Sequence, residues 1–242
     1  MKRKDRDPRL EREAGQRRLE AAGTGRRDAC PTVAPPDHLT EGFHSRDHLP
    51  HLKREGASYF VTFRLAGTLP ANVLQKLKQE REQILQRAQT AQRPLTWQEQ
   101  EDLFHCYSAR VDTYLDAGHG DCFLRQPEIA RFVTGALRFF DGQRYELRAW
   151  VVMPNHVHVV VWPRPPQTLS QVLHSWKSFT SKQANKALAR TGEFWQTETY
   201  DHLIRDDDDH ARCVAYTLSN PVSAWLCAQP EDWPWSSAYR GS

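Results

Sequence analysis

The sequence predicts an α+β protein with a ferredoxin-like sandwich, in which an antiparallel sheet carries helices on one face. Two observations support this fold. Runs rich in β-branched and aromatic residues, which favour strands, lie at residues 58–65, 144–152, 156–162 and 194–205. Helical spacing of apolar residues separates the first run from the second and the third from the fourth. The resulting β-α-β-β-α-β order is that of the ferredoxin-like fold.

A hairpin connects the two middle strands of this pattern. Pro154 and Asn155 supply the turn, because both residue types favour tight turns. The β-branched and aromatic residues on either side, from Ala149 to Trp162, suit two paired strands. We therefore expect the second of these strands to begin at His156.

The first crossover contains a helical insertion at residues 71–117. Apolar residues recur at helical spacing from Leu74 onward, among charged residues, and predict its first helix. Pro94 interrupts the pattern. Thr96, with Glu99 three residues later, then predicts the capping box of a second helix.

Three more helices are predicted, at residues 128–140, 168–189 and 208–219. The acidic run Asp206–Asp209 suits the start of the last one, because the helix dipole favours negative charge there. Successive helical positions point in different directions, so we do not interpret this run as a metal cluster. Pro221 is expected to end or bend the helix at Asn220.

Residues 1–43 are interpreted as a disordered basic tail that precedes one domain at residues 44–242. Basic and acidic residues are interleaved in this segment with almost no apolar partners. Such a segment cannot bury enough surface to offset the entropy of ordering. It is either a basic arm that contacts a phosphate backbone or an extension without a function of its own.

Composition narrows the class of protein. The 242 residues carry a net charge of +3 and a pI near 8.6, which point only weakly to an anionic partner. No apolar run approaches the roughly 20 residues that span a bilayer, and no signal peptide opens the sequence. The five cysteines form no Cys-x-x-Cys pair, so neither a zinc knuckle nor a disulfide framework is indicated. We therefore expect a cytoplasmic protein.

His156 and His158 are the first candidate site residues. They are two positions apart on a predicted strand, so both imidazoles point to the same face of the sheet. Neutral imidazole is a common ligand of divalent metals. Two ligands alone do not make a metal site, and the alternative is a polar strand face with two solvated histidines.

Tyr216 and Asn220 are the second pair of candidates. They are four positions apart on the last predicted helix, so they share one helix face. If that face covers the two histidines, the imidazoles and the amide oxygen can hold Mg²⁺ or Mn²⁺, which polarises a phosphodiester. The phenol of Tyr216 is then placed to attack phosphorus. The alternative is a tyrosine that only packs.

Several short motifs together resemble the REP-associated tyrosine transposases, which are single-tyrosine HUH transposases of bacterial insertion sequences. The resemblance covers residues 45–240 and depends on the order and spacing of the motifs, because none of them is specific alone. In chain order they are Tyr59-Phe-Val-Thr-Phe, Met153-Pro-Asn-His-Val-His, Trp176-Lys, Phe194-Trp-Gln, Asn220-Pro-Val and Trp233-Pro-Trp-Ser-Ser. The family fold is the ferredoxin-like sheet predicted above.

The resemblance implies a role for each candidate residue. His156 and His158 are implied to bind Mg²⁺ or Mn²⁺, and Asn220 is implied as an additional metal ligand. The family nucleophile lies four residues before this asparagine, which is the position of Tyr216. Tyr200, which has polar neighbours, is the alternative nucleophile.

The implied activity is the cleavage and rejoining of single-stranded DNA near hairpins, in DNA transposition or in the processing of REP elements. The reaction passes through a 5′-phosphotyrosine and a free 3′-hydroxyl. Lys177, Lys182 and Lys186 are expected to contact the DNA backbone, and Trp176 to stack on a base. A solvated helix face and a core tryptophan are the alternatives for these four residues.

The resemblance leaves other questions open. Relatives act as monomers or as homodimers, so the resemblance is consistent with either state for this chain. The chain is expected to be bacterial and nucleoid-associated. One alternative function is a non-catalytic protein, derived from a transposase, that binds DNA hairpins. Another is a phosphodiesterase that uses water, in which Tyr216 is structural.

Overall fold

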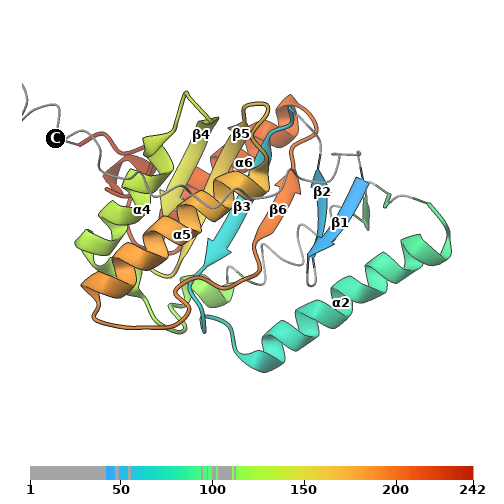
Figure 1. Cartoon of the computed structure of the whole chain (residues 1–242), viewed down its shortest axis with the longest axis horizontal. Coiled ribbons are helices and arrows are strands. Elements are labelled where there is room, and N and C mark those ends of the chain that lie inside the picture. The colour runs from blue at the N-terminus through green and yellow to red at the C-terminus, as the bar shows by residue number, and fades with distance from the viewer. Residues whose placement is uncertain are drawn as a thin grey trace, which may run out of the picture. The chain divides into compact units, whose positions relative to one another are not determined.

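Four strands form the central sheet in the order β4-β5-β3-β6 (Figure 1). The computed structural model describes residues 42–46, 49–53 and 56–241, with gaps at 94, 97, 100–101, 103–110 and 112. The strands are β3 (Tyr59–Arg64), β4 (Tyr145–Val152), β5 (His156–Pro163) and β6 (Tyr200–Leu203). All neighbouring pairs are antiparallel. This arrangement confirms the predicted ferredoxin-like α+β fold.

The last strand is shorter than predicted. β6 pairs with β3 only over Tyr200–Leu203, whereas the sequence pattern extends over 194–205. Trp195 makes a single bridge to Leu65, and the chain leaves the ladder between these two contacts. The side chain of Lys177 donates to the main chain in this interval.

Two helices cover one face of the sheet (Figure 1). They are α4 (Pro127–Phe139) and α5 (Leu169–Ala187). Their apolar side chains pack on alternate residues of β5, and the shared core includes Val133, Trp176, Val157, Val159 and Val161. A capping box at Thr168 and Gln171 fixes the start of α5. The predicted bounds of both helices are correct to within two residues.

Helix α6 (Asp207–Ser223) packs on the opposite face of the sheet, over β4 and β5. The Asp206 side chain caps it by accepting a hydrogen bond from the Asp209 amide at 2.8 Å. The predicted end at Ser219 is wrong, because the helix continues through Pro221 to Ser223. Proline removes one main-chain donor, but the Ala224 amide still bonds to the Asn220 carbonyl at 3.0 Å.

The predicted insertion is present and begins with α2 (Ala71–Thr90). The predicted capping box is also present: the Thr96 amide donates to Glu99 and the Glu99 amide donates to Thr96 Oγ1. Most of the second insertion helix lies outside the described residues. So does most of the predicted tail, although β1 (Gly42–Arg46) begins inside it.

Smaller elements complete the described structure. β1 pairs with β2 (Leu49–Lys53) in a two-stranded sheet that the sequence analysis did not predict. Short 3₁₀ helices lie at Phe123–Arg125 and Pro230–Asp232. The segment after the second one borders β4, where the Val152 amide bonds to the Trp235 carbonyl at 2.7 Å. None of the helices in the described part of the chain is long and apolar enough to cross a membrane.

Candidate active site

The two histidines of β5 lie on the sheet face that α6 covers. His158 is paired with Thr62 and His156 with Arg64 in the β3–β5 ladder. Their neighbours Val157 and Val159 point to the other face and enter the main core. Both histidines have 0% exposed surface, so the alternative of a solvated strand face is wrong.

Asn155 fixes the protonation of His156. Its side-chain amide nitrogen donates to the carbonyls of Leu115 and His119, at 3.0 and 3.1 Å. The amide oxygen must therefore be the atom that accepts from His156 Nδ1, at 2.8 Å. This assignment places the His156 proton on Nδ1 and leaves a lone pair on Nε2. The turn residue thus leaves His156 Nε2 able to accept a proton or a metal ion.

Thr62 holds the second imidazole through a hydrogen bond of 2.8 Å between its Oγ1 and His158 Nδ1. The Nε2 atoms of His158 and His156 are 3.0 Å apart. A hydroxyl can donate or accept, so Thr62 supports either tautomer of His158. It can accept from Nδ1–H while Nε2 of His158 serves as a ligand.

Burial keeps both imidazoles neutral near pH 7. It lowers the pKa of His156 to about 3, although the Asn220 side chain acts in the opposite direction. Burial and the neighbouring His156 also hold the pKa of His158 well below its usual range. Neutral imidazole is the form that binds metal ions, so the electrostatics favour ligation.

Tyr216 lies directly against this pair. Its ring meets the His158 ring edge to face, with centroids 5.5 Å apart and an interplanar angle of 74°. Phe60 contacts both rings and stacks on His158 at 5.6 Å. Tyr216 is half-buried. The helix face predicted from the sequence therefore does cover the histidines.

Three atoms of this site fit the divalent metal that the motifs imply. The 3.0 Å between the two Nε2 atoms is about the spacing of adjacent ligands ~2.1 Å from one octahedral ion. The Asn220 side chain lies close enough to His156 to affect its pKa, but its buried Oδ1 has no partner with hydrogen-bond geometry in the described part of the chain. Such an oxygen costs free energy unless a donor or a cation satisfies it. The residues present therefore fit the metal.

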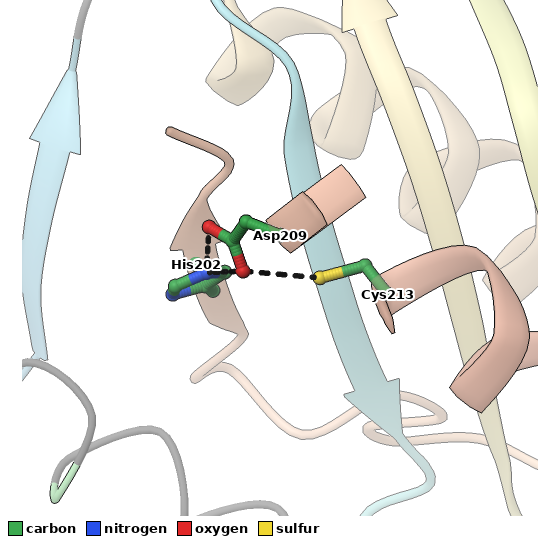
Figure 2. A group of neighbouring side chains, drawn as sticks. All are labelled: His202, Asp209 and Cys213. Carbon is green, nitrogen blue, oxygen red and sulfur yellow. Dashed lines mark hydrogen bonds and ion pairs between the residues drawn. The ribbon is translucent and has the colours of Figure 1, made fainter. Parts of the chain in front are cut away.

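A separate cluster of hydrogen-bonded side chains connects the start of α6 to β6. Figure 2 shows that His202 on β6 and Cys213 on α6 both point to the carboxylate of Asp209. His202 Nε2 lies 2.9 Å from Asp209 Oδ2. Arg205 and Arg212 also donate to this carboxylate, each at 3.2 Å. Burial would raise the pKa of Asp209, but hydrogen bonds from His202 and Arg205 hold it well below its usual range.

This cluster is an anchor rather than a second metal centre. Its carboxylate oxygens already accept hydrogen bonds from two guanidinium groups and one imidazole. These charge-assisted hydrogen bonds, rather than a metal ion, satisfy the carboxylate. The acidic run is evident in the sequence, but this role of Asp209 was not predicted from it. The three-residue spacing between Asp209 and Arg212 on the predicted helix was the available signal, because such pairs share one helix face.

The runner-up nucleophile Tyr200 lies on the same side of the sheet, paired with Thr62. It is 7% exposed, and its ring packs against Phe60 at 6.5 Å. Tyr216, by contrast, contacts an imidazole directly. The rings of both tyrosines thus contact Phe60, and that of Tyr216 also contacts His158.

The residues predicted to bind DNA occupy different environments along α5. Trp176 is 2% exposed and donates to the Tyr145 hydroxyl at 2.9 Å, so it occupies a core position. Lys177 donates to the carbonyls of Gln196 and Thr197 and to Thr199 Oγ1. Lys182 and Lys186 are exposed.

Comparison with known proteins relates the chain to transposases. Residues 130–211 match the family model described as "Transposase IS200 like". This match is about a third of the chain; it includes both histidines but ends before Tyr216 and Asn220.

Two curated proteins are similar over part of their length. The REP-associated tyrosine transposase of Escherichia coli (strain K12) is 32% identical over 96 residues, which is 40% of this chain and 56% of that protein. A protein of Haemophilus influenzae is 28% identical over 106 residues, which is 40% of this chain and 60% of that relative. The chain thus spans little more than half the length of these relatives.

Solved structures are also similar. A REP-associated tyrosine transposase bound to a REP hairpin aligns over 80% of this chain and 81% of its own chain, with a TM-score of 0.43 and 18% identity. The family match and the curated relatives confirm the resemblance that the sequence motifs predicted.

Proposed function

We propose that this relative of the REP-associated tyrosine transposases is a metal-dependent DNA transesterase that cleaves and rejoins single-stranded DNA near hairpins. The observation that carries the proposal is the contact of the Tyr216 ring with the His158 ring. It brings the ring of a tyrosine against one of two neutral imidazoles, on the helix that also carries the unpaired oxygen of Asn220. The relative's name supports the same chemistry.

His156 Nε2, His158 Nε2 and Asn220 Oδ1 would hold the metal, which we propose to be Mg²⁺ or Mn²⁺. Oxygen and imidazole ligands suit either ion. When bound, the ion supplies Lewis-acid polarisation of a phosphodiester oxygen. Asn155 and Thr62 keep the imidazoles oriented, through hydrogen bonds to their Nδ1 atoms.

Tyr216 would carry out the covalent step. Its phenolic oxygen forms a bond to phosphorus as the bond from phosphorus to O3′ breaks. The phenol loses its proton and the departing O3′ gains one, so the step consumes no net proton. The products are a 5′-phosphotyrosine and a free 3′-hydroxyl. Attack by a second 3′-hydroxyl reverses the step and releases Tyr216, so no ATP is needed.

The exposed Lys182 and Lys186 on α5 are proposed to contact the DNA backbone. Because α5 and α6 cover opposite faces of the sheet, these contacts would involve DNA that flanks the reacting phosphate. The biological role we propose is DNA transposition or the processing of REP elements.

One observation favours a second candidate function, a non-catalytic protein that binds DNA hairpins. Both imidazoles have no exposed surface, so a phosphate reaches them only if the covering side chains move. A protein that never opens this site would bind DNA without cutting it.

A single-stranded hairpin oligonucleotide labelled at its 3′ end separates these functions. We expect incubation with Mn²⁺, followed by denaturing electrophoresis, to show a labelled protein band that Tyr216→Phe loses and Tyr239→Phe keeps. Tyr239 is an exposed tyrosine near the C-terminus. Binding without cleavage would support the second function. Cleavage that survives Tyr216→Phe without a protein adduct would indicate attack by water.

A further inference from the structure

Arg64 is a buried cation with unused donors beside the candidate active site. Its exposed surface is only 3%, yet its Nε and Nη2 atoms have no hydrogen-bond partner in the described part of the chain. A buried charge without a partner is expensive, and proteins seldom keep one unless a ligand uses it.

The position of Arg64 in the ladder places it next to the histidines. It is the β3 residue paired with His156. Arg64 is two residues after Thr62, so both side chains project from the same face of β3. That face is the site face, because Thr62 Oγ1 bonds to His158 at 2.8 Å. Arg64 therefore occupies the strand position next to His156, one of the proposed metal ligands.

The free atoms of Arg64 form one edge of the guanidinium. Nε and Nη2 donate in parallel directions, with the spacing that two oxygens of one phosphate or carboxylate accept. The nearby Lys177 adds positive charge: burial, followed by the effect of Arg64, lowers the pKa of Lys177 to about 8. Lys177 already donates to Gln196, Thr197 and Thr199, whereas the Arg64 edge remains available.

We propose that Arg64 is a phosphate-binding residue of this site, whose Nε–Nη2 edge donates hydrogen bonds to two oxygens of one phosphodiester group of the DNA strand. The proposal rests on the function proposed above and adds a specific anion receptor to it. Arg64 would hold the strand so that the reacting phosphate meets Tyr216. It would also balance the charge of a phosphate inside a buried site.

The test pairs Arg64→Gln with neutral phosphates in the DNA. Binding of a fluorescent single-stranded hairpin is measured by anisotropy, with each phosphodiester near the hairpin replaced in turn by a methylphosphonate. The proteins are Tyr216→Phe, to prevent cleavage, and the same chain with Arg64→Gln. We expect Arg64→Gln to weaken binding of unmodified DNA about tenfold. One methylphosphonate should weaken DNA binding by the parent protein to a similar extent. The same methylphosphonate should have little further effect on DNA binding by the Arg64→Gln protein.

Stability gives an independent readout. If Arg64 is unpaired without DNA, Arg64→Gln removes a buried charge, so the melting temperature should stay the same or rise. Arg64→Lys keeps the positive charge but loses the two parallel donors of the guanidinium. It should therefore recover only part of the affinity for the hairpin. Arg138→Gln, an exposed change on α4, is the control for loss of one positive charge and should bind DNA almost normally.

The outcomes separate the inference from the function. Independent, additive losses at every phosphate would contradict the role of Arg64 while the proposed function stands. A lower melting temperature of Arg64→Gln would show that Arg64 pairs within the chain, which also contradicts it. Failure of the parent protein to bind any hairpin would instead overturn the proposed function, and the inference with it.

Discussion

At the scale of single residues, both imidazoles of the candidate site depend on a hydrogen bond at Nδ1 that the sequence does not reveal. Asn155 is the clearest case, because its amide is oriented by two carbonyls and then fixes the proton on His156. The motif predicts that the two imidazoles share a face, and the structure adds the position of the proton on His156. Asn155, which the sequence pattern indicates only as a turn residue, thus orients one of the proposed metal ligands.

The two histidines give the first prediction. His156→Ala or His158→Ala should abolish cleavage of a labelled hairpin with Mn²⁺, because each removes one proposed ligand. Affinity for the hairpin, measured by fluorescence anisotropy, should stay almost unchanged, since both imidazoles lie beneath the surface. His174→Ala, on the exposed side of α5, is the control. Loss of both binding and cleavage would mean that the histidines are structural.

Asp116 gives a second prediction at this scale. Its Oδ1 is buried without a partner in the described residues, and burial raises its pKa from 3.8 to about 6. Because the folded state binds this proton more tightly, the stabilisation is complete below pH 3.8 and is lost as the pH rises through 6. Above that pH the charged carboxylate destabilises the fold.

Asp116→Asn should therefore stabilise the protein at pH 7.5 by on the order of 1 kcal/mol, a figure reduced for partial solvent screening. The gain should vanish near pH 4, where the carboxyl is already protonated. Urea unfolding at both pH values measures this difference. Asp121→Asn, in the exposed loop that follows, is the control. An equal effect at both pH values would refute the assignment to burial.

At the scale of elements, α6 carries the proposed nucleophile, and its position is set at its first turn. Asp209 connects this turn to His202 on β6. Tyr216 lies seven residues further along the same helix, so a shift at the anchor is transmitted to the phenol. This anchor adds directional hydrogen bonds to the apolar packing of α6 on the sheet, which is less directional.

Asp209→Asn tests the anchor. Removing one partner of a buried ion pair leaves the other charges uncompensated, so we expect a loss of about 3 kcal/mol in the free energy of unfolding. The hydrogen bonds that lower the pKa of Asp209 stabilise the fold above the unfolded pKa, and this stabilisation is lost as the pH falls below it.

Asp208→Asn is the matched control, because it makes the same change of charge at an exposed position of the same helical turn. It should alter stability by less than about 1 kcal/mol. Equal losses in the two variants, measured by denaturant titration, would show that helix-dipole effects rather than the anchor explain the role of Asp209.

The sequence predicted the main elements and one side of the site, because these depend on local periodicity. Alternation on β5 placed His156 and His158 together, and helical spacing placed Tyr216 with Asn220. The contacts between elements could not be predicted in this way. The pairing of His202 with Asp209 and the position of Arg64 opposite His156 depend on strand register and on how α6 docks, neither of which is encoded by spacing along one element.

At the scale of the whole molecule, the two faces of the sheet have different roles. The face under α4 and α5 holds the large apolar core, whereas the face under α6 holds a smaller core that includes Phe60 and Cys213. The polar side chains of the candidate site lie on this second face. The larger apolar core thus lies on one side of the sheet, and the other side holds a buried polar site.

The central claim is that Tyr216 becomes covalently bound to DNA, and mapping of the adduct tests it most directly. The protein is incubated with hairpin DNA and Mn²⁺, digested with nuclease and protease, and analysed by mass spectrometry. We predict a nucleotide attached through its 5′ phosphate to Tyr216. A nucleotide on Tyr200 or another residue, or cleaved DNA without any adduct on the protein, would contradict it.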